Sequence, residues 1–139
     1  MNNPNGLPSE LLEIAAALQL AVAVLNLFLV RLLYWKDDIA RMPLLLREVF
    51  QVHVWFISIT LAIFGVVTWR FAAEMADHAD PACQWLAGGI GLFWAIRTML
   101  QVGFYSSSHW RGQATRTVAH VALLCVYGGF AALYLWAAF

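Results

Sequence analysis

Four long runs of apolar residues, separated by short polar connections, set the pattern of this sequence. A helix needs about 20 predominantly apolar residues to cross the hydrocarbon core of a bilayer. The runs lack the strict alternation of polar and apolar residues that a membrane β-barrel requires, so helices are expected. The predicted transmembrane helices lie at about residues 11–33, 49–69, 85–105 and 117–139.

Composition requires an apolar solvent around the chain. Of its 139 residues, 63% are hydrophobic and 12% are charged, and the mean hydropathy is +0.72. A soluble domain carries roughly a quarter of its residues as charged side chains, and a small one leaves much of its surface in water. We therefore predict one all-α domain over residues 1–139. It should be an integral membrane up-and-down four-helix bundle, a multi-pass protein of the cell's inner or plasma membrane.

The charges of the connections predict the orientation of the bundle. The first ten residues contain no Lys or Arg, and the connection that follows Arg70 is acidic. Basic residues stay on the cytoplasmic side of a membrane protein, so both termini and the acidic connection are predicted to lie outside. The basic residues behind this prediction are Lys36, Arg41 and Arg47 in the first connection and Arg111 and Arg116 in the third.

The first connection is predicted to contain an element of its own. Residues 35–47 mix apolar side chains, such as those of Ile39 and Leu45, with the basic ones. This mixture is typical of a short helix that lies in the membrane interface. Pro43 is expected to kink or end that helix.

Polar side chains inside the predicted spans are informative, because lipid offers them no hydrogen-bond partner. At a rise of about 1.5 Å per residue, three of them fall roughly 6–8 Å inside the cytoplasmic boundary, and two lie about one turn deeper. Every span contributes to this set, which we call the polar layer. Its members are His53, Gln101 and His120 at the first depth and Asn26 and Arg97 at the second.

Arg97 is the most demanding member of the polar layer. A guanidinium keeps its proton in proteins, and a charged side chain at the centre of a bilayer costs about 2.5–3.5 kcal/mol on insertion scales. Arg97 shares a helix face with Gln101, four residues further on, whereas Glu13 and Glu48 lie near the membrane boundaries. We therefore expect Arg97 to face the bundle interior and to line a polar cavity open to the cytoplasm.

The fourth span carries a polar stripe with a seven-residue repeat. His120, Tyr127 and Tyr134 project from one side of a helix packed at a 3.5-residue period. Buried tyrosine hydroxyls normally find a hydrogen-bond partner, so the stripe is expected to face the core. Glycines of the third and fourth spans are expected to let helices approach closely. They are Gly88, Gly89, Gly91, Gly128 and Gly129.

Several functional classes have no signature in the sequence. The net charge is zero and the basic residues are not clustered, which argues against nucleic acid as a partner. No motif of a hydrolase, a redox dithiol or a phosphate-binding loop is present. The acidic connection carries metal-ligand residue types at a spacing that matches no metal site, so a solvated loop is expected. These residues are Glu74, Asp77, His78, Asp80 and Cys83.

One functional hypothesis is a b-type haem protein. The second and fourth spans are diagonal in an up-and-down bundle, so His53 and His120 at equal depth could face each other across its core. Two imidazoles are suitable axial ligands for a haem that transfers electrons. Arg97 would neutralise a haem propionate, and haem b is the cofactor that this hypothesis requires.

Two other hypotheses use the same polar layer. In one, Asn26, Gln101, Arg97 and Tyr127 form a pocket that binds or transports an anionic or lipid-like ligand. In the other, the layer only sets helix register. The chain is then an accessory or assembly subunit, whose partners are the lipid bilayer and either a lateral membrane protein or a second copy. The sequence favours the accessory subunit and leaves the other hypotheses, and catalysis, open.

The predicted orientation is testable by cysteine labelling. A membrane-impermeant maleimide added outside should modify Cys83 and should spare a cysteine placed at Ser107, because the two positions lie on opposite sides of the bilayer. Labelling in the reverse pattern would overturn the orientation and move the polar layer to the other leaflet.

Overall fold

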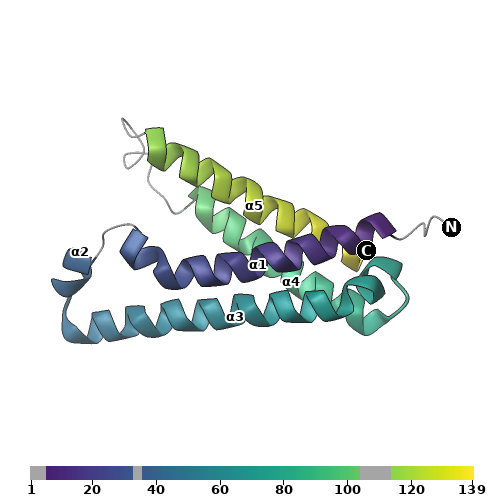
Figure 1. Ribbon diagram of the computed structural model, residues 1–139, viewed down its shortest axis with the longest axis horizontal. Coiled ribbons are helices and arrows are strands. Elements are labelled where there is room, and N and C mark those ends of the chain that lie inside the picture. Colours follow the sequence, from purple (N-terminus) through teal and green to yellow (C-terminus); the bar gives the residue numbers. More distant parts are fainter. Residues whose placement is uncertain (1–5, 33–35, 104–113) are drawn as a thin grey trace. The chain divides into compact units, whose positions relative to one another are not determined.

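The computed structural model describes residues 6–32, 36–103 and 114–139; most of these residues are helical and none of them lies in a strand. Four of the helices are long and apolar enough to cross a membrane, as a multi-pass membrane protein requires. Figure 1 shows these four as long ribbons. The helices are α1 (Gly6–Leu32), α2 (Lys36–Ala40), α3 (Leu44–Asp77), α4 (Pro81–Gly103) and α5 (Ala114–Ala138). The all-α, four-span expectation is confirmed at this level, and the bundle topology and orientation stay predictions.

The chain divides into two compact units. One comprises Glu13–Ala72 and so holds most of α1, all of α2 and most of α3. The other comprises Met1–Leu12 and Ala73–Phe139, which include α4 and α5. We call them the α1–α3 unit and the α4–α5 unit and describe each by itself.

Helices α1 and α3 pack closely where a glycine removes a side chain. A Cβ built on Gly65 of α3 would lie 2.8 Å from Cγ of Leu20 and 3.1 Å from the carbonyl oxygen of Ala16, both on α1. Small residues at a helix interface bring backbones together in this way. Gly65 was not among the glycines that the sequence suggested.

Helix α3 is longer than the predicted second span at both ends. It contains 34 residues and has non-helical dihedral angles at Phe71, where it kinks. At a rise of 1.5 Å per residue such a helix reaches about 50 Å, whereas a bilayer with its headgroups measures about 40–45 Å. The expectation that residues 74–83 form a solvated loop is partly wrong, because Glu74 and Asp77 lie on the last turns of α3.

A short helix is present in the first connection, where the interfacial helix is expected, and its place at the membrane interface stays a prediction. Helix α2 has five residues and ends at Ala40, before Pro43. The Pro43 carbonyl accepts a hydrogen bond from the backbone N–H of Arg47 at 3.1 Å, so the proline precedes a new helix instead of kinking an existing one. Residues 33–35, including Trp35, and residues 104–113, which hold Ser107 and Arg111, lie outside the described residues.

The turn between α3 and α4 is built from capping interactions. Asp80 accepts a hydrogen bond from the N–H of Ala82 at 2.9 Å through Oδ1, and Pro81 stands at the first position of α4. An acidic N-cap followed by proline is a favourable helix start. His78 adopts the left-handed conformation with φ 53°, and its Nε2 lies 3.1 Å from the carbonyl oxygen of Trp136 on α5.

Cys83 lies on the first turn of α4 and is only 6% exposed. Its thiol lies 3.8 Å from Oδ2 of Asp80. The expectation that Cys83 reacts readily with a maleimide is therefore wrong, because the protein covers the sulfur. The orientation is better tested with a cysteine at Ala79, which is exposed, in a chain that carries Cys83→Ala.

Helices α4 and α5 pack around one tryptophan. Trp94 is 1% exposed, and its ring lies 5.1 Å from the Tyr127 ring and 4.8 Å from the Phe130 ring, centroid to centroid. Tyr127 and Tyr134 are 8% and 0% exposed. The expectation that the stripe on the fourth span faces the core is confirmed for these two tyrosines.

The glycines of α4 and α5 divide into two groups. A Cβ on Gly91 would lie 3.0 Å from the backbone nitrogen of Leu135, and one on Gly88 would lie 3.5 Å from Cβ of Ala138. Gly89, Gly128 and Gly129 have nothing within 4 Å of such a Cβ. Within the α4–α5 unit, close approach therefore holds at Gly91 and Gly88 and not at the other three glycines.

A bulky residue at Gly91 should weaken the α4–α5 unit. Gly91→Val forces a side chain against the backbone of α5, and overpacking of this kind costs about 1–3 kcal/mol. Gly129→Val is the matched control, since it adds the same side chain into open space. The measurement is thermal unfolding of the purified protein in detergent. Equal losses of Tm in the two variants would contradict the packing described here.

Candidate functional site

The polar layer consists of contacts between neighbouring helices. In the α1–α3 unit, Nδ2 of Asn26 donates to Oγ of Ser58 at 2.9 Å and to the carbonyl oxygen of Val54 at 3.1 Å. Ser58 is 4% exposed. Asn26 therefore ties α1 to α3, since both of its acceptors lie on the opposite helix.

Gln101 and His120 form the corresponding contact in the α4–α5 unit. Nε2 of Gln101 lies 2.9 Å from Nδ1 of His120, and Gln101 is 4% exposed. In this arrangement the amide donates and Nδ1 accepts, so the neutral imidazole carries its proton on Nε2. An amide flip with the other tautomer would preserve the contact in the opposite direction. Either way, Gln101 holds α4 against α5.

Arg97 lies over an aromatic ring of the stripe. Its Cζ is 5.0 Å from the centroid of Tyr127, and its side chain is half-buried. A cation–π contact contributes about 0.5–2 kcal/mol, which is less than the cost of about 2.5–3.5 kcal/mol for an arginine in the membrane centre. The contact with Tyr127 therefore offsets part of the cost of the charge.

Two buried polar atoms flank Arg97 on α4. The Oε1 atom of Gln101 and the Nε1 atom of Trp94 have no hydrogen-bond partner among the described residues. A buried polar group without a partner costs about 1–3 kcal/mol. The helix α4 therefore carries, on either side of Arg97, a buried polar atom whose hydrogen-bonding capacity the described residues leave unused.

His53 contacts its own helix. Its Nδ1 lies 3.0 Å from the Val49 carbonyl oxygen, one turn earlier on α3, and its side chain is exposed. A proton on Nδ1 would leave Nε2 with a lone pair, which is the arrangement that metal-bound histidines use. His53 belongs to the α1–α3 unit and His120 to the α4–α5 unit, so no interatomic distance tests the bis-histidine haem site, which stays a prediction.

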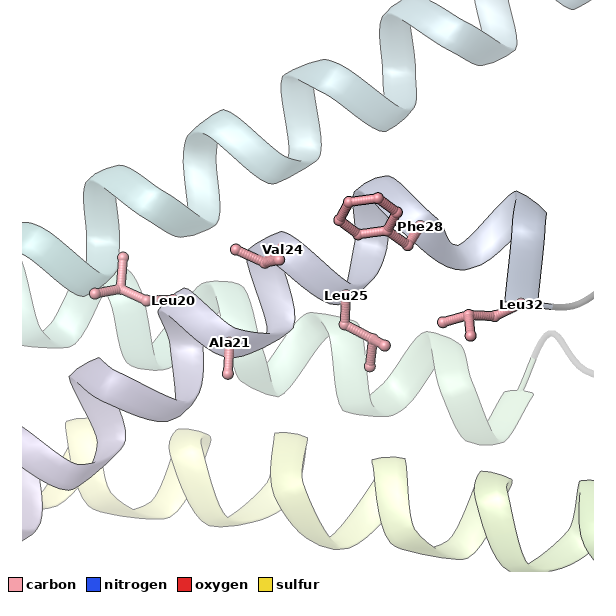
Figure 2. Close-up of a pocket in the computed structure, with 6 residues that line it drawn as sticks. All are labelled: Leu20, Ala21, Val24, Leu25, Phe28 and Leu32. Atoms are coloured by element: carbon pink, nitrogen blue, oxygen red, sulfur yellow. The ribbon is translucent and has the colours of Figure 1, made fainter.

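Two of the hollows that the described residues line lie in the α1–α3 unit. One lies along α1 and is entirely apolar; Figure 2 shows its six side chains, which all project from this helix. It offers no group that would recognise a polar ligand. The second lies where α1, α2 and α3 meet, and its lining includes Arg31, Lys36 and Arg47. Neither hollow is lined by Arg97, so the predicted cavity beside Arg97 stays a prediction.

Sequence reasoning missed several buried polar residues. Ser58 and Thr68 of α3 and Gln19 of α1 are 4%, 0% and 0% exposed. Serine and threonine raise no signal in a membrane helix, because their hydroxyls can bond to a carbonyl of the same helix. Gln19 is different. It lies in the middle of the first span, and its amide alone could have drawn attention to it.

Comparison of the sequence with protein-family models, with curated proteins and with solved structures finds no match in any of the three.

The contact between Gln101 and His120 should be measurable as a coupling energy. Double-mutant cycles in membrane proteins give about 0.6 kcal/mol on average for interhelical hydrogen bonds, with a maximum of about 1.7. We expect a value in this range from the cycle of Gln101→Leu and His120→Leu, measured by unfolding in detergent. Thr98→Val replaces Gln101→Leu in the control cycle, since the Thr98 hydroxyl bonds to Trp94 of its own helix. Equal coupling in both cycles would contradict a specific contact.

Proposed function

We propose that this chain is an accessory or assembly subunit of a membrane protein complex, whose polar layer holds its helices in register. Its lipid-facing helices would pack laterally against another membrane protein. The observation that carries the proposal is the pairing of Asn26 with Ser58 and of Gln101 with His120 across helix pairs. Polar groups that pair with each other fix helix positions and need no ligand.

The apolar surface of α3 supports a lateral partner. Only 17% of the most apolar 18-residue segment of α3 is buried, whereas 28% of the corresponding segment is buried in each of the other three spans. Exposed apolar residues follow one another along one side of α3 at spacings of three and four, as positions on one helix face do. Each of them is 45–68% exposed: Val49, Val52, Phe56, Ile59, Ile63 and Val66. This face, which we call the α3 stripe, is where we expect the partner to pack.

A second candidate function is recognition of an anionic ligand at Arg97. It is favoured by the unpartnered atoms of Gln101 and Trp94 on the same helix. A ligand with one anionic group and one further polar group would satisfy Arg97 and both of these atoms. Electron transfer through haem gains no comparable support from the contacts of His53 and His120.

Site-specific photocrosslinking in native membranes tests the accessory role. A crosslinking residue at Ile63 should yield one discrete protein adduct, and the same residue at Leu92, which is 57% exposed on α4, should yield lipid adducts. Two differently tagged copies of the chain reveal whether the adduct is a second copy. Lipid adducts alone at both positions would remove the support for a lateral partner.

Arg97→Leu separates the two candidate functions. It removes a costly charge and should preserve or raise thermal stability. An accessory subunit should keep its Ile63 adduct in this variant, because the α3 stripe is unchanged. If the variant loses its biological function but keeps the adduct, the result favours recognition of an anionic ligand at Arg97. A Soret band in the purified wild-type protein would instead favour the haem hypothesis.

A further inference from the structure

The hollow at the junction of α1, α2 and α3 has a chemistry that the polar layer does not explain. It has a volume of about 450 Å³ and is lined by the end of α1, the short helix α2 and the first turns of α3. The whole lining belongs to the α1–α3 unit. Because α1 and α3 flank a short connection, the hollow lies at one end of this helix pair.

Three cations line the hollow. Arg31 comes from the last turn of α1, Lys36 from the start of α2 and Arg47 from the first turn of α3. The chain's eight acidic residues all fall in the described ranges, and none of them lines the hollow. Three helices thus converge with positive side chains on a space that contains no carboxylate, and this space attracts an anion.

The lining changes from charged to apolar along the helix axes. Leu27 lies one turn before Arg31 on α1, and Val54 and Trp55 lie two turns after Arg47 on α3. Phe50 lines the hollow between the cations and these deeper residues. Two turns correspond to about 11 Å, so the hollow offers positive charge at one end and an apolar wall toward the membrane interior.

We propose that this hollow binds the headgroup of an anionic phospholipid. The phosphate would contact Arg31, Lys36 and Arg47, because charge-assisted hydrogen bonds to phosphate are the strongest that these side chains form. The glycerol backbone and the first acyl carbons would pack against Phe50, Val54 and Trp55. Free phosphate carries no apolar group that could pack against these residues. The proposal goes beyond the accessory role and does not depend on it.

Native mass spectrometry of the 139-residue chain in detergent tests this proposal. Phosphatidylglycerol should bind at least about tenfold more tightly than phosphatidylcholine, because the quaternary ammonium of phosphatidylcholine would lie close to the three cations and be repelled by them. Equal binding of the two lipids would overturn the proposal. Inorganic phosphate and glycerol phosphate form the second arm. If either displaces phosphatidylglycerol at equimolar concentration, the site takes a free phosphate and the lipid assignment is wrong.

A matched pair of variants locates the site. Arg47→Gln should weaken phosphatidylglycerol binding about tenfold. Arg41→Gln removes the same charge from the same connection, but Arg41 is exposed and does not line the hollow, so it should change binding less than about twofold. Equal losses in the two variants would mean diffuse attraction and would overturn the site.

A measurement on the wild-type chain covers the case in which Arg47→Gln does not fold. A phosphatidylglycerol with a photoreactive group near its headgroup should label peptides from residues 27–55. Labelling spread evenly over the four long helices would overturn the proposal. Because these experiments use the purified chain alone, their failure leaves the photocrosslinking result at Ile63 unaffected.

Discussion

Inside a bilayer, a polar side chain has no water to bond, so the protein must supply its partner. The interhelical contacts of this chain follow from that constraint. Asn26 reaches across to Ser58, Gln101 reaches across to His120, and Arg97 lies over the ring of Tyr127. These contacts fix which faces of the helices meet, and the apolar residues around them fill the remaining space.

Small residues bring the backbones of each helix pair close together. Gly65 brings α3 against α1 near Leu20, and Gly91 brings α4 against Leu135 of α5. Without the hydrophobic effect to drive helices together in lipid, close backbone approach and interhelical hydrogen bonds supply the association. In each unit, the hydrogen-bonded pair and the glycine therefore have complementary roles: one sets the register and the other the distance.

Different parts of the α1–α3 unit suit different partners. The α3 stripe is apolar and exposed, and it would meet another membrane protein. The cationic hollow joins the ends of α1 and α3 to α2, and it would meet a lipid headgroup. A lipid bound in the cationic hollow would contact α1, α2 and α3 together. It would thereby stabilise the position of α3, the helix that carries the α3 stripe. Arg97, on α4, is independent of both.

The sequence by itself determined the four apolar helices, because length and hydropathy suffice when the solvent is a bilayer. It also singled out Asn26, Gln101 and His120, since an amide or imidazole inside an apolar run is conspicuous. It could not supply their partners. Depth along a helix follows from residue number, but the direction in which a side chain points depends on how neighbouring helices are rotated. Only the tertiary structure therefore paired Asn26 with Ser58.

The unknown rotation of neighbouring helices also explains the other differences between the sequence-based expectations and the structure. The sequence could not tell Gly91, which faces α5, from Gly129, which faces open space, because both are glycines in apolar helices. The extension of α3 beyond Trp69 depends on where the next helix begins. The burial of Cys83 likewise depends on the packing around the first turn of α4. Hydropathy decides which segments enter the membrane, and contact between helices decides which of their residues can act together.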